Sequence, residues 1–379
     1  MNFDLSEEHK AVQEAAKSFA ESECKPGVIE RDRDQIVGFE QLKQLGELGF
    51  MGMMVDPKYG GSGMDTLSYV LAIEEISKID ASISVAMSVN NSLVCWGLEN
   101  FGSEDQKQKY LVPLAKGEKI GAFCLSEPEA GSDATSQRTK AIDMGDHYLL
   151  NGTKNWITNG STASTYLVIA QTDADKGHNG INVFILEKGM PGFEISVKED
   201  KLGIRGSDTH TLVFNDVKIP KENRVGDNGF GFKFAMKTLA GGRIGIAAQA
   251  LGIAAGAYDL SLAYSKERET FGKTINKHQA IQFKLADMYV DIENARNLVY
   301  KSAWHKDQKM DYNLSGAVAK LHASEVAMRT TIEAVQIHGG YGYVKEYHVE
   351  RLMRDAKITQ IYEGTSEIQR IVIARNTIN

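Results

Sequence analysis

Apolar residues recur every three or four positions in the C-terminal part of the chain. One such run has spacings of 4, 3, 4, 3 and 4 and consists of Ile281, Leu285, Met288, Ile292, Ala295 and Val299. This period places one apolar stripe along a helix that packs against other helices. All six prolines lie at or before Pro220. Because proline costs a helix interior about 3 kcal/mol, its absence after residue 220 favours long helices there.

The N-terminal part also has a helical pattern. Val12, Ala15, Ala16, Phe19 and Ala20 fall on one face, and Ser6 precedes them as a candidate N-cap followed by two glutamates. The segment Lys25–Gly27 contains a proline and a glycine that would end this helix. Further helical patterns cover residues 40–50, 65–80 and 104–116.

The middle of the chain has a different pattern, of short β-rich runs. They are Thr165–Ala170, Ile181–Leu186, Phe193–Val197 and His210–Phe214, and Asn-Gly pairs at 151–152, 159–160 and 179–180 indicate turns. A small antiparallel barrel or sandwich is expected. We therefore predict an α+β multidomain fold, with a helical domain at 1–120, a β-barrel domain at 121–228 and a helical-bundle domain at 229–379.

Composition excludes several classes of protein. The net charge of -7 differs from the basic footprint of a nucleic-acid binder. No GxGxxG follows a strand and no GxxxxGK(S/T) motif is present, so a Rossmann dehydrogenase or a P-loop enzyme is not expected. The nine histidines have no metal-ligand spacing, so no metal site is expected. The three cysteines form no CxxC pair, which indicates a reducing compartment. No leader or membrane-spanning run is recognised, so a cytoplasmic bacterial protein is expected, or a mitochondrial matrix protein if the chain is a processed eukaryotic one.

Three segments rich in small polar residues are candidate ligand loops. Phe123–Asp133 offers hydroxyls and backbone N–H groups to a polar ring edge or a phosphate. Trp156–Gly160 offers an indole for stacking on an aromatic cofactor. Ile361–Glu367 places the Glu363 carboxylate before a glycine and two hydroxyls. Taken one at a time, a solvated turn, a core tryptophan and a surface glutamate are the commoner explanations of such residues.

Taken together and in order, these segments resemble the acyl-CoA dehydrogenase family along essentially the whole chain. Gly242–Gly252 and Lys201–Ser207 are most similar to short-chain, butyryl-CoA dehydrogenases. The resemblance implies a helix–β–helix fold, one FAD per subunit and a homotetramer built as a dimer of dimers. It also implies an acyl-CoA substrate and an electron-transferring flavoprotein as electron acceptor.

The resemblance assigns site residues by position. The expected FAD contacts within one subunit are Phe123, Leu125, Ser126, Gly131, Ser132, Trp156, Ile157, Thr158, Thr365, Ser366 and Glu367. The positions that reach the FAD of a neighbouring subunit in the family are Arg268, Gln279, Gln336, Ile337, His338, Gly339 and Gly340. The expected substrate contacts are Ser132, Arg243, Gln249, Thr359 and Gly364. Of these, Gln249 and Thr359 are expected to form the floor of a short acyl pocket.

Glu363 matches the catalytic base of the family. It would abstract the weakly acidic α-proton of the thioester while the flavin N5 accepts the β-hydride, giving a trans-2-enoyl-CoA. Burial should raise the pKa of this carboxyl and make it a stronger base. Some relatives carry the base at the position of Gly242, where a glycine cannot serve.

The chain departs from the family pattern at three positions. Ala240 stands where short-chain relatives usually carry aspartate, which puts one CoA contact in doubt. His348 replaces a usual proline, and Ser126 replaces a commoner threonine but keeps the hydroxyl.

Other functions remain open from the sequence. One is dehydrogenation of a short branched-chain acyl-CoA, and another is an acyl-CoA oxidase, although such oxidases are usually longer chains. A third, of a different class, is a catalytically silent acyl-CoA-binding or scaffold protein of the same fold.

Overall fold

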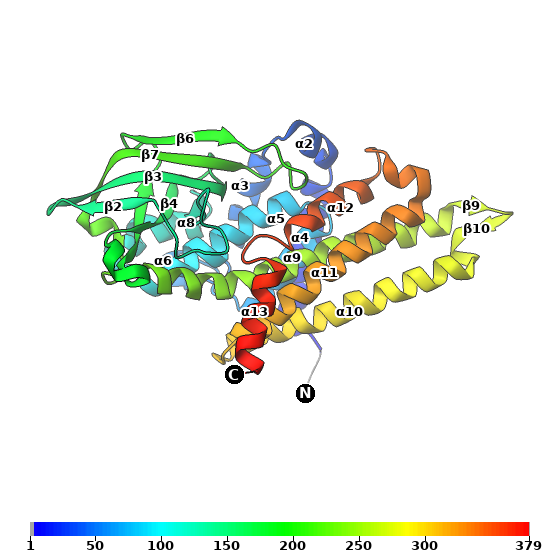
Figure 1. Ribbon diagram of the computed structural model, residues 1–379. Helices are drawn as coiled ribbons and strands as arrows, with labels where there is room; N and C mark the ends of the chain where they lie inside the picture. The colour runs from blue at the N-terminus through cyan, green and yellow to red at the C-terminus, as the bar shows by residue number, and fades with distance from the viewer. Residues whose placement is uncertain (1–3, 379) are drawn as a thin grey trace.

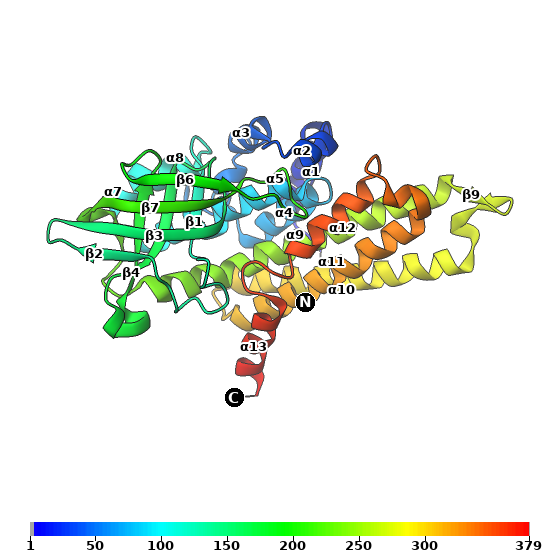
Figure 2. The same ribbon diagram turned by 45° about the horizontal axis from the view of Figure 1, so that its top comes forward.

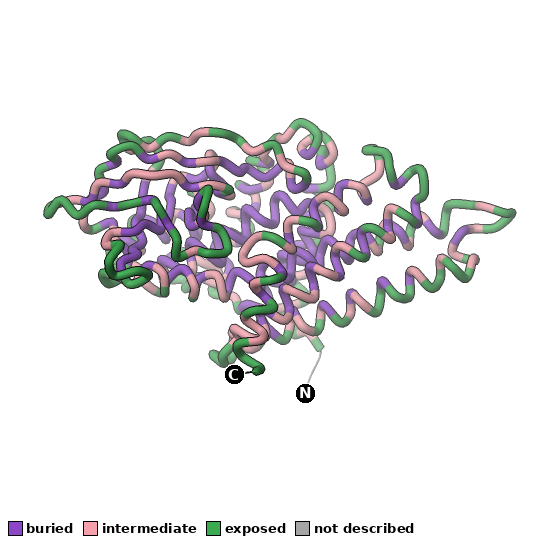
Figure 3. Tube along the Cα trace, viewed as in Figure 1, coloured by how far each residue is buried: buried purple, intermediate pink, exposed green. Residues whose placement is uncertain are grey.

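The computed structural model describes residues 4–378, and its first part is a domain of short helices. The helices are α1 (Glu7–Phe19), α2 (Val28–Asp34), α3 (Phe39–Glu47), α4 (Thr66–Ser77), α5 (Ala81–Ser88), α6 (Trp96–Phe101), α7 (Glu104–Gln106) and α8 (Val112–Ala115). Short π or 3₁₀ turns extend or connect them at Ala20–Cys24, Phe50–Gly52, Pro57–Tyr59, Val89–Cys95 and Lys107–Leu111. The predicted cap is confirmed, because the Ser6 hydroxyl accepts a hydrogen bond from the His9 N–H at 3.1 Å. Helices α4 and α5 are buried almost throughout and lie against the C-terminal bundle (Figure 3).

The middle domain is a β-sheet that folds over on itself (Figure 2). Its strands are β1 (Gly121–Cys124), β2 (Lys140–Asp143), β3 (His147–Thr158), β4 (Thr165–Gln171), β5 (Ile181–Glu187), β6 (Phe193–Lys198), β7 (Thr209–Pro220) and β8 (Arg224–Val225). The pairing order is β6-β7-β3-β2-β4-β5-β8, with β1 added beside β4. Short 3₁₀ turns occupy Ala174–Gly180 and Lys221–Asn223. Tyr148, Tyr166, Phe184 and Phe214 fill the separate core that this sheet encloses.

Two details of the β domain correct the sequence-based expectation. Strand β1 pairs with β4 in parallel, as Gly121 opposite Thr165 shows, whereas an antiparallel sheet was predicted. A parallel pair needs a long crossover, and β2 and β3 provide it here. Asn151–Gly152 was predicted as a turn but lies inside β3 at a register shift. Gly152 has φ +143° there, and a Cβ would lie 2.6 Å from the Cα of Thr139, so this position requires glycine.

The C-terminal domain is a bundle of long helices. They are α9 (Gly231–Glu267), α10 (Gln279–Asp307), α11 (Asn313–His338), α12 (His348–Ile358) and α13 (Ser366–Thr377). A small hairpin of β9 (Glu269–Thr270) and β10 (Lys273–Thr274) joins α9 to α10, with 3₁₀ turns at Ile275–Lys277 and Gly339–Tyr343. The predicted stripe on α10 is confirmed: Leu285, Met288, Ile292, Ala295 and Val299 are buried, and Ile281 is partly buried against the same core. Helix α9 is long and apolar enough to span a membrane, but 72% of its most apolar window is buried inside the protein, so it is the core helix of the bundle.

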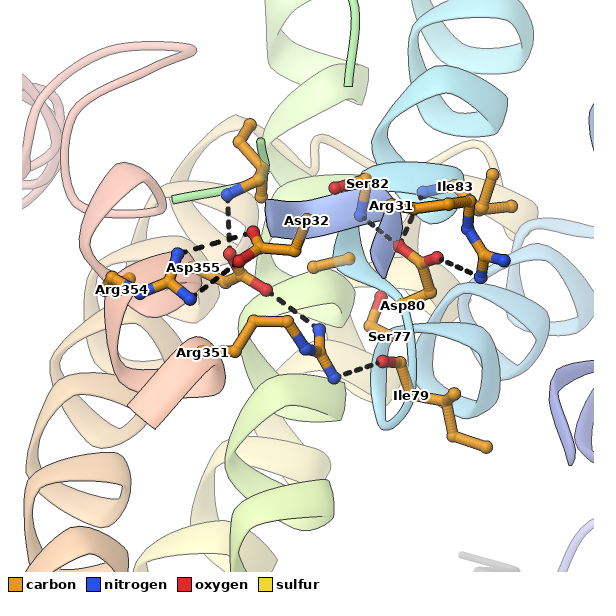
Figure 4. Close-up of polar contacts among 12 residues, drawn as sticks. Arg31, Asp32, Ser77, Ile79, Asp80, Ser82, Ile83, Arg351, Arg354 and Asp355 are labelled. Atoms are coloured by element: carbon orange, nitrogen blue, oxygen red, sulfur yellow. Dashed lines mark hydrogen bonds and ion pairs between the residues drawn. The ribbon is translucent and has the colours of Figure 1, made fainter. Parts of the chain in front are cut away.

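A buried network of charges joins the three domains beside α12 (Figure 4). Asp355 pairs with Arg351 at 3.1 Å and accepts the backbone N–H of Ile204, which belongs to the β domain, at 2.5 Å. Arg351 also donates to the Ile79 carbonyl at 2.7 Å, and Arg354 pairs with Asp32 of α2 at 2.7 Å. Helix α12 is therefore anchored to both other domains immediately before the chain enters the segment 359–365.

Candidate functional site

The segment that carries Glu363 is a strained loop between α12 and α13. Glu363 has φ +50° and Gly364 has φ +92°, so two successive residues occupy the left-handed region. Glycine adopts this conformation freely, whereas a glutamate there costs of order 1 kcal/mol or more. The Thr365 hydroxyl then caps α13 by accepting the Ile368 N–H at 3.3 Å. Strain of this kind persists where the surroundings hold it, and it marks candidate functional positions.

The Glu363 carboxylate lies against the buried helix α9. Its Oε2 atom is shielded from water and has no hydrogen-bond partner among the described residues 4–378. A Cβ at Gly242 would lie 2.0 Å from that oxygen, so glycine at this position makes room for the carboxylate. Burial raises the pKa of Glu363 to about 7, although the positive charges of Lys320 and Arg243 act against the rise. The group is thus poised to exchange a proton near neutral pH.

Gln249 and Thr359, which are predicted to form the floor of an acyl pocket, are both fully buried. The Tyr362 hydroxyl donates to the Gln249 Oε1 atom, and the Gln249 amide donates to the Ala81 carbonyl at 2.8 Å. Gln249 therefore links α9 and α5 to the residue that precedes Glu363. Arg243 is buried near the same loop, where it donates to the Asn313 side chain at 2.9 Å.

A second set of predicted residues lies around the C-terminal end of β1. Figures 1 and 2 both show the connection between β1 and β2 on the side of the β domain that faces the loop before α13. A buried ion pair holds this connection, because Lys154 contacts Glu127 at 2.7 Å and donates to the Leu125 carbonyl at 2.9 Å. Neither the N–H nor the hydroxyl of Ser126 or Ser132 makes a hydrogen bond within residues 4–378.

Trp156 adjoins this connection at a β-bulge near the end of β3. Its side chain is 61% exposed, and its backbone has φ +62°. A bulky aromatic residue with positive φ is a conformational outlier, and an exposed indole loses the burial that normally stabilises tryptophan. The adjacent Ile157 is buried and fixes the strand. The indole is thus presented as a flat apolar surface beside unused hydrogen-bond donors.

The whole chain matches known protein families and structures. Three family models cover it in order: the N-terminal domain of acyl-CoA dehydrogenase at residues 6–118, the middle domain at 122–217 and the C-terminal domain at 229–378. The chain belongs to the acyl-CoA dehydrogenase family. It is 52% identical, over 99% of both chains, to "Acyl-CoA dehydrogenase, short-chain specific" of Clostridium acetobutylicum.

Solved structures give the same result. The butyryl-CoA dehydrogenase of Megasphaera elsdenii superposes with a TM-score of 0.98 at 51% identity over the full length of both chains. A chain solved in work on the electron transferring flavoprotein of Acidaminococcus fermentans and flavin-based electron bifurcation superposes with a TM-score of 0.99 at 51% identity, again over both full lengths. The expected helix–β–helix acyl-CoA dehydrogenase fold is confirmed.

The cofactor of this family is FAD, and the residues of the dehydrogenase fit it. The exposed Trp156 offers an aromatic face, and Ser126 and Ser132 offer free donors. At the N-terminus of α13, the Ser366 hydroxyl is buried without a partner among residues 4–378. Stacking surface and unpaired donors are what a flavin ring and its phosphates require. Among the described residues there is no group of three or more His, Cys, Asp or Glu side chains that could hold a metal ion.

The remaining predicted FAD residues lie elsewhere in this dehydrogenase chain. Arg268 follows α9, Gln279 begins α10 and the segment 336–340 includes the end of α11, so these residues belong to the end of the bundle that carries the β9–β10 hairpin, opposite the β domain (Figure 1). Arg268 lies 5.6 Å from the Tyr341 ring, and the His338 ring stacks on Tyr264 at 4.2 Å. One chain therefore does not bring the two sets of predicted residues together.

Several residues of the site were not found from the sequence. They are Lys320 and Tyr69, which interact electrostatically with Glu363, together with the Lys154–Glu127 pair and the hydroxyl of Tyr362. Each acts through a partner far away in the chain, so no local spacing indicates it. Gly242, which leaves room for the Glu363 carboxylate, was the one feature of this arrangement that the local sequence indicated.

Proposed function

We propose that Glu363 is the catalytic base of an FAD-dependent short-chain acyl-CoA dehydrogenase. The reaction is the α,β-dehydrogenation of a butyryl-CoA-like thioester to the trans-2-enoyl-CoA. The observation that carries the residue assignment is the Glu363 carboxylate itself: its Oε2 atom is shielded and unpartnered, and its pKa is raised to about 7. A carboxyl that only filled a structural role would be hydrogen-bonded or ionised in water.

The chemical demand is the removal of a weakly acidic α-proton. A base is most effective when its pKa lies near the operating pH, and Glu363 meets that condition. Charge that develops on the thioester oxygen needs a fixed donor. The Glu363 N–H makes no hydrogen bond within residues 4–378 and is available for that role.

FAD, when bound, supplies the acceptor for the β-hydride. The residues proposed to hold it within one subunit are those around Ser126, Ser132, Trp156 and Thr365. Lys154 keeps the Leu125–Glu127 backbone against β3, so the donors of this connection stay fixed. Preorganised donors of this kind bind without the entropic cost of ordering a loop.

Acyl-chain selection is proposed to depend on Gln249 and Thr359. Gln249 is buried and fixed by two elements, so it does not swing aside for a longer chain without loss of hydrogen bonds. One methylene changes recognition by only about 1–3 kcal/mol, so neighbouring chain lengths should react more slowly and not be excluded. A panel of kcat/KM values for butyryl-, hexanoyl-, isobutyryl- and 2-methylbutyryl-CoA separates the straight-chain from the branched-chain alternative.

Assembly and electron transfer are further parts of the proposal. The placement of Arg268, Gln279 and residues 336–340 supports FAD sites completed by a second subunit, in a homotetramer arranged as a dimer of dimers. The relative solved in work on an electron transferring flavoprotein supports a similar acceptor here, and the bacterial relatives support a cytoplasmic location. Sedimentation of the holoenzyme gives its mass, and a dimer or monomer with full FAD content would contradict the tetramer.

Anaerobic titration of the purified protein with butyryl-CoA tests the function. Bleaching of the flavin band is expected in the native enzyme. Glu363→Gln should retain FAD and bind the thioester but fail to bleach. Bleaching at the native rate in Glu363→Gln would refute the role of the carboxylate. A colourless protein that cannot be reconstituted with FAD but binds acyl-CoA would favour the silent scaffold.

A further inference from the structure

Lys320 of α11 is a buried lysine whose position calls for an explanation. The residue is fully buried, and its Nζ atom donates to the Gly364 carbonyl at 2.8 Å. Within residues 4–378 it forms no ion pair with a carboxylate within 4 Å. Buried lysines are rare because removing an ammonium from water is costly, and an apolar residue would pack here at lower cost.

The Gly364 carbonyl is held by two buried side chains. The Gln369 amide of α13 also donates to it at 2.8 Å, and it reaches the Glu363 carbonyl at 3.3 Å. The backbone held in this way is the strained pair with φ +50° and +92°. Lys320 and Gln369 therefore fix the same carbonyl, but only Lys320 brings a charge.

The titratable groups around Glu363 and Lys320 come from four helices. Lys320 on α11 and Arg243 on α9 both favour the ionised carboxylate, and Tyr69 of α4 is a neutral neighbour whose pKa is raised by burial. Glu325 of α11 and Glu367 of α13 act on Lys320 in turn. Burial lowers the pKa of Lys320 to about 8, so the ammonium is retained at neutral pH.

We propose that Lys320 is a positioning residue for proton abstraction, which fixes the Gly364 carbonyl and electrostatically stabilises the ionised Glu363 carboxylate. This inference rests on the proposed role of Glu363 as the base. Without Lys320, the carboxylate loses its principal opposing charge and becomes harder to ionise. The fraction of enzyme with a competent base then falls at neutral pH.

The test compares three variants of the FAD-loaded enzyme by stopped-flow bleaching with butyryl-CoA from pH 5.5 to 9. Lys320→Met removes both the hydrogen bond and the charge. The acidic limb of its pH–rate profile, where the rate rises as the base ionises, should move up by about one pH unit. Gln369→Met removes a hydrogen bond to the same carbonyl without a charge; it should lower the rate at every pH and leave the limb in place. Lys320→Arg keeps the charge and should restore the limb. FAD content and thermal unfolding are measured for each.

The outcomes are distinguishable. An unmoved limb in Lys320→Met, or an equal movement in Gln369→Met, overturns the proposal. If Lys320→Met does not fold, Lys320→Gln replaces it, since it keeps a polar side chain without the charge. Glu363→Gln separates the two hypotheses: activity in that variant sinks the base assignment, whereas an inactive Glu363→Gln with an unmoved limb in Lys320→Met sinks only the role of Lys320.

Discussion

Replacing Gly242 by alanine should slow proton abstraction without unfolding the protein. The new Cβ would lie 2.0 Å from Glu363 Oε2 and 2.9 Å from its carboxyl carbon, and 2.8 Å from the Cδ2 methyl of Leu93, which must also shift. Because Cβ contacts under 3.0 Å are essentially never observed, the carboxylate must move by about 1 Å. A displacement of about 1 Å can cost about 10²-fold in rate, and a positioned base contributes about 10² to 10⁴-fold. We expect the bleaching rate of Gly242→Ala to fall by about 10² to 10³-fold.

Gly241→Ala provides a matched control one residue away in α9. Its Cβ would meet only Lys306 Nζ, at 3.5 Å, which is an ordinary contact. Both changes replace a glycine inside the same helix, where alanine is favoured by up to about 1 kcal/mol. Both proteins should therefore fold, and Gly241→Ala should react at nearly the native rate.

The assay is single-turnover bleaching with butyryl-CoA, with FAD content and thermal unfolding measured on the same preparations. A native rate in Gly242→Ala would refute the reasoning, because the carboxylate would then either lie elsewhere or not act as the base. An equal loss of rate in Gly241→Ala would assign the effect to the helix in general.

Three further predictions follow from buried charges. Lys154→Met should destabilise the β1–β2 connection by about 3–5 kcal/mol and lower the FAD content, because it leaves the buried Glu127 carboxylate unpaired. Arg138→Met breaks an exposed ion pair in the same connection and should leave FAD bound. Asp355→Asn should lower the thermal midpoint by leaving a buried arginine unpaired, and Asp200→Asn, at an exposed pair, should change it little. The bleaching rate should rise with pH through about 7, where Glu363 ionises, and a rate that does not change with pH would contradict this. Glu363→Gln should stabilise the folded protein by at most about 3 kcal/mol above pH 7, because it removes a buried charge. This gain should be lost as the pH falls from 7 to 4.5, because the folded state binds the proton of Glu363 more tightly than the unfolded state does.

The elements that the sequence predicted well are those set by local patterns. The stripe on α10 follows from a period that any helix must satisfy, and the Ser6 cap follows from a hydroxyl placed before a helical run. The parallel pairing of β1 was missed because it depends on how the chain returns through β2 and β3. Asn151–Gly152 was predicted wrongly because a glycine required by a bulge has the same local signature as one required by a turn.

The site was predictable only as positions, not as an arrangement. The resemblance placed Glu363, but Lys320 lies 43 residues earlier in the chain and Gly242 lies 121 residues earlier, and neither spacing corresponds to any local period. Tertiary packing of α9, α11 and the 359–365 loop creates the low-dielectric environment that sets the pKa. The domain boundaries at 120 and 228 and the individual cofactor and substrate contacts stay predictions.

The candidate site gathers features that destabilise a folded chain. Glu363 and Trp156 have positive φ, the carboxylate has an oxygen without a partner, and Lys320 is a buried ammonium. Each feature costs free energy, and no packing need explains them as a group. Of these features, the strained Glu363 lies in the segment that follows α12, and the buried Asp355–Arg351 pair holds that helix. We therefore expect a change that loosens α12, such as loss of this pair, to disturb the position of the Glu363 carboxylate.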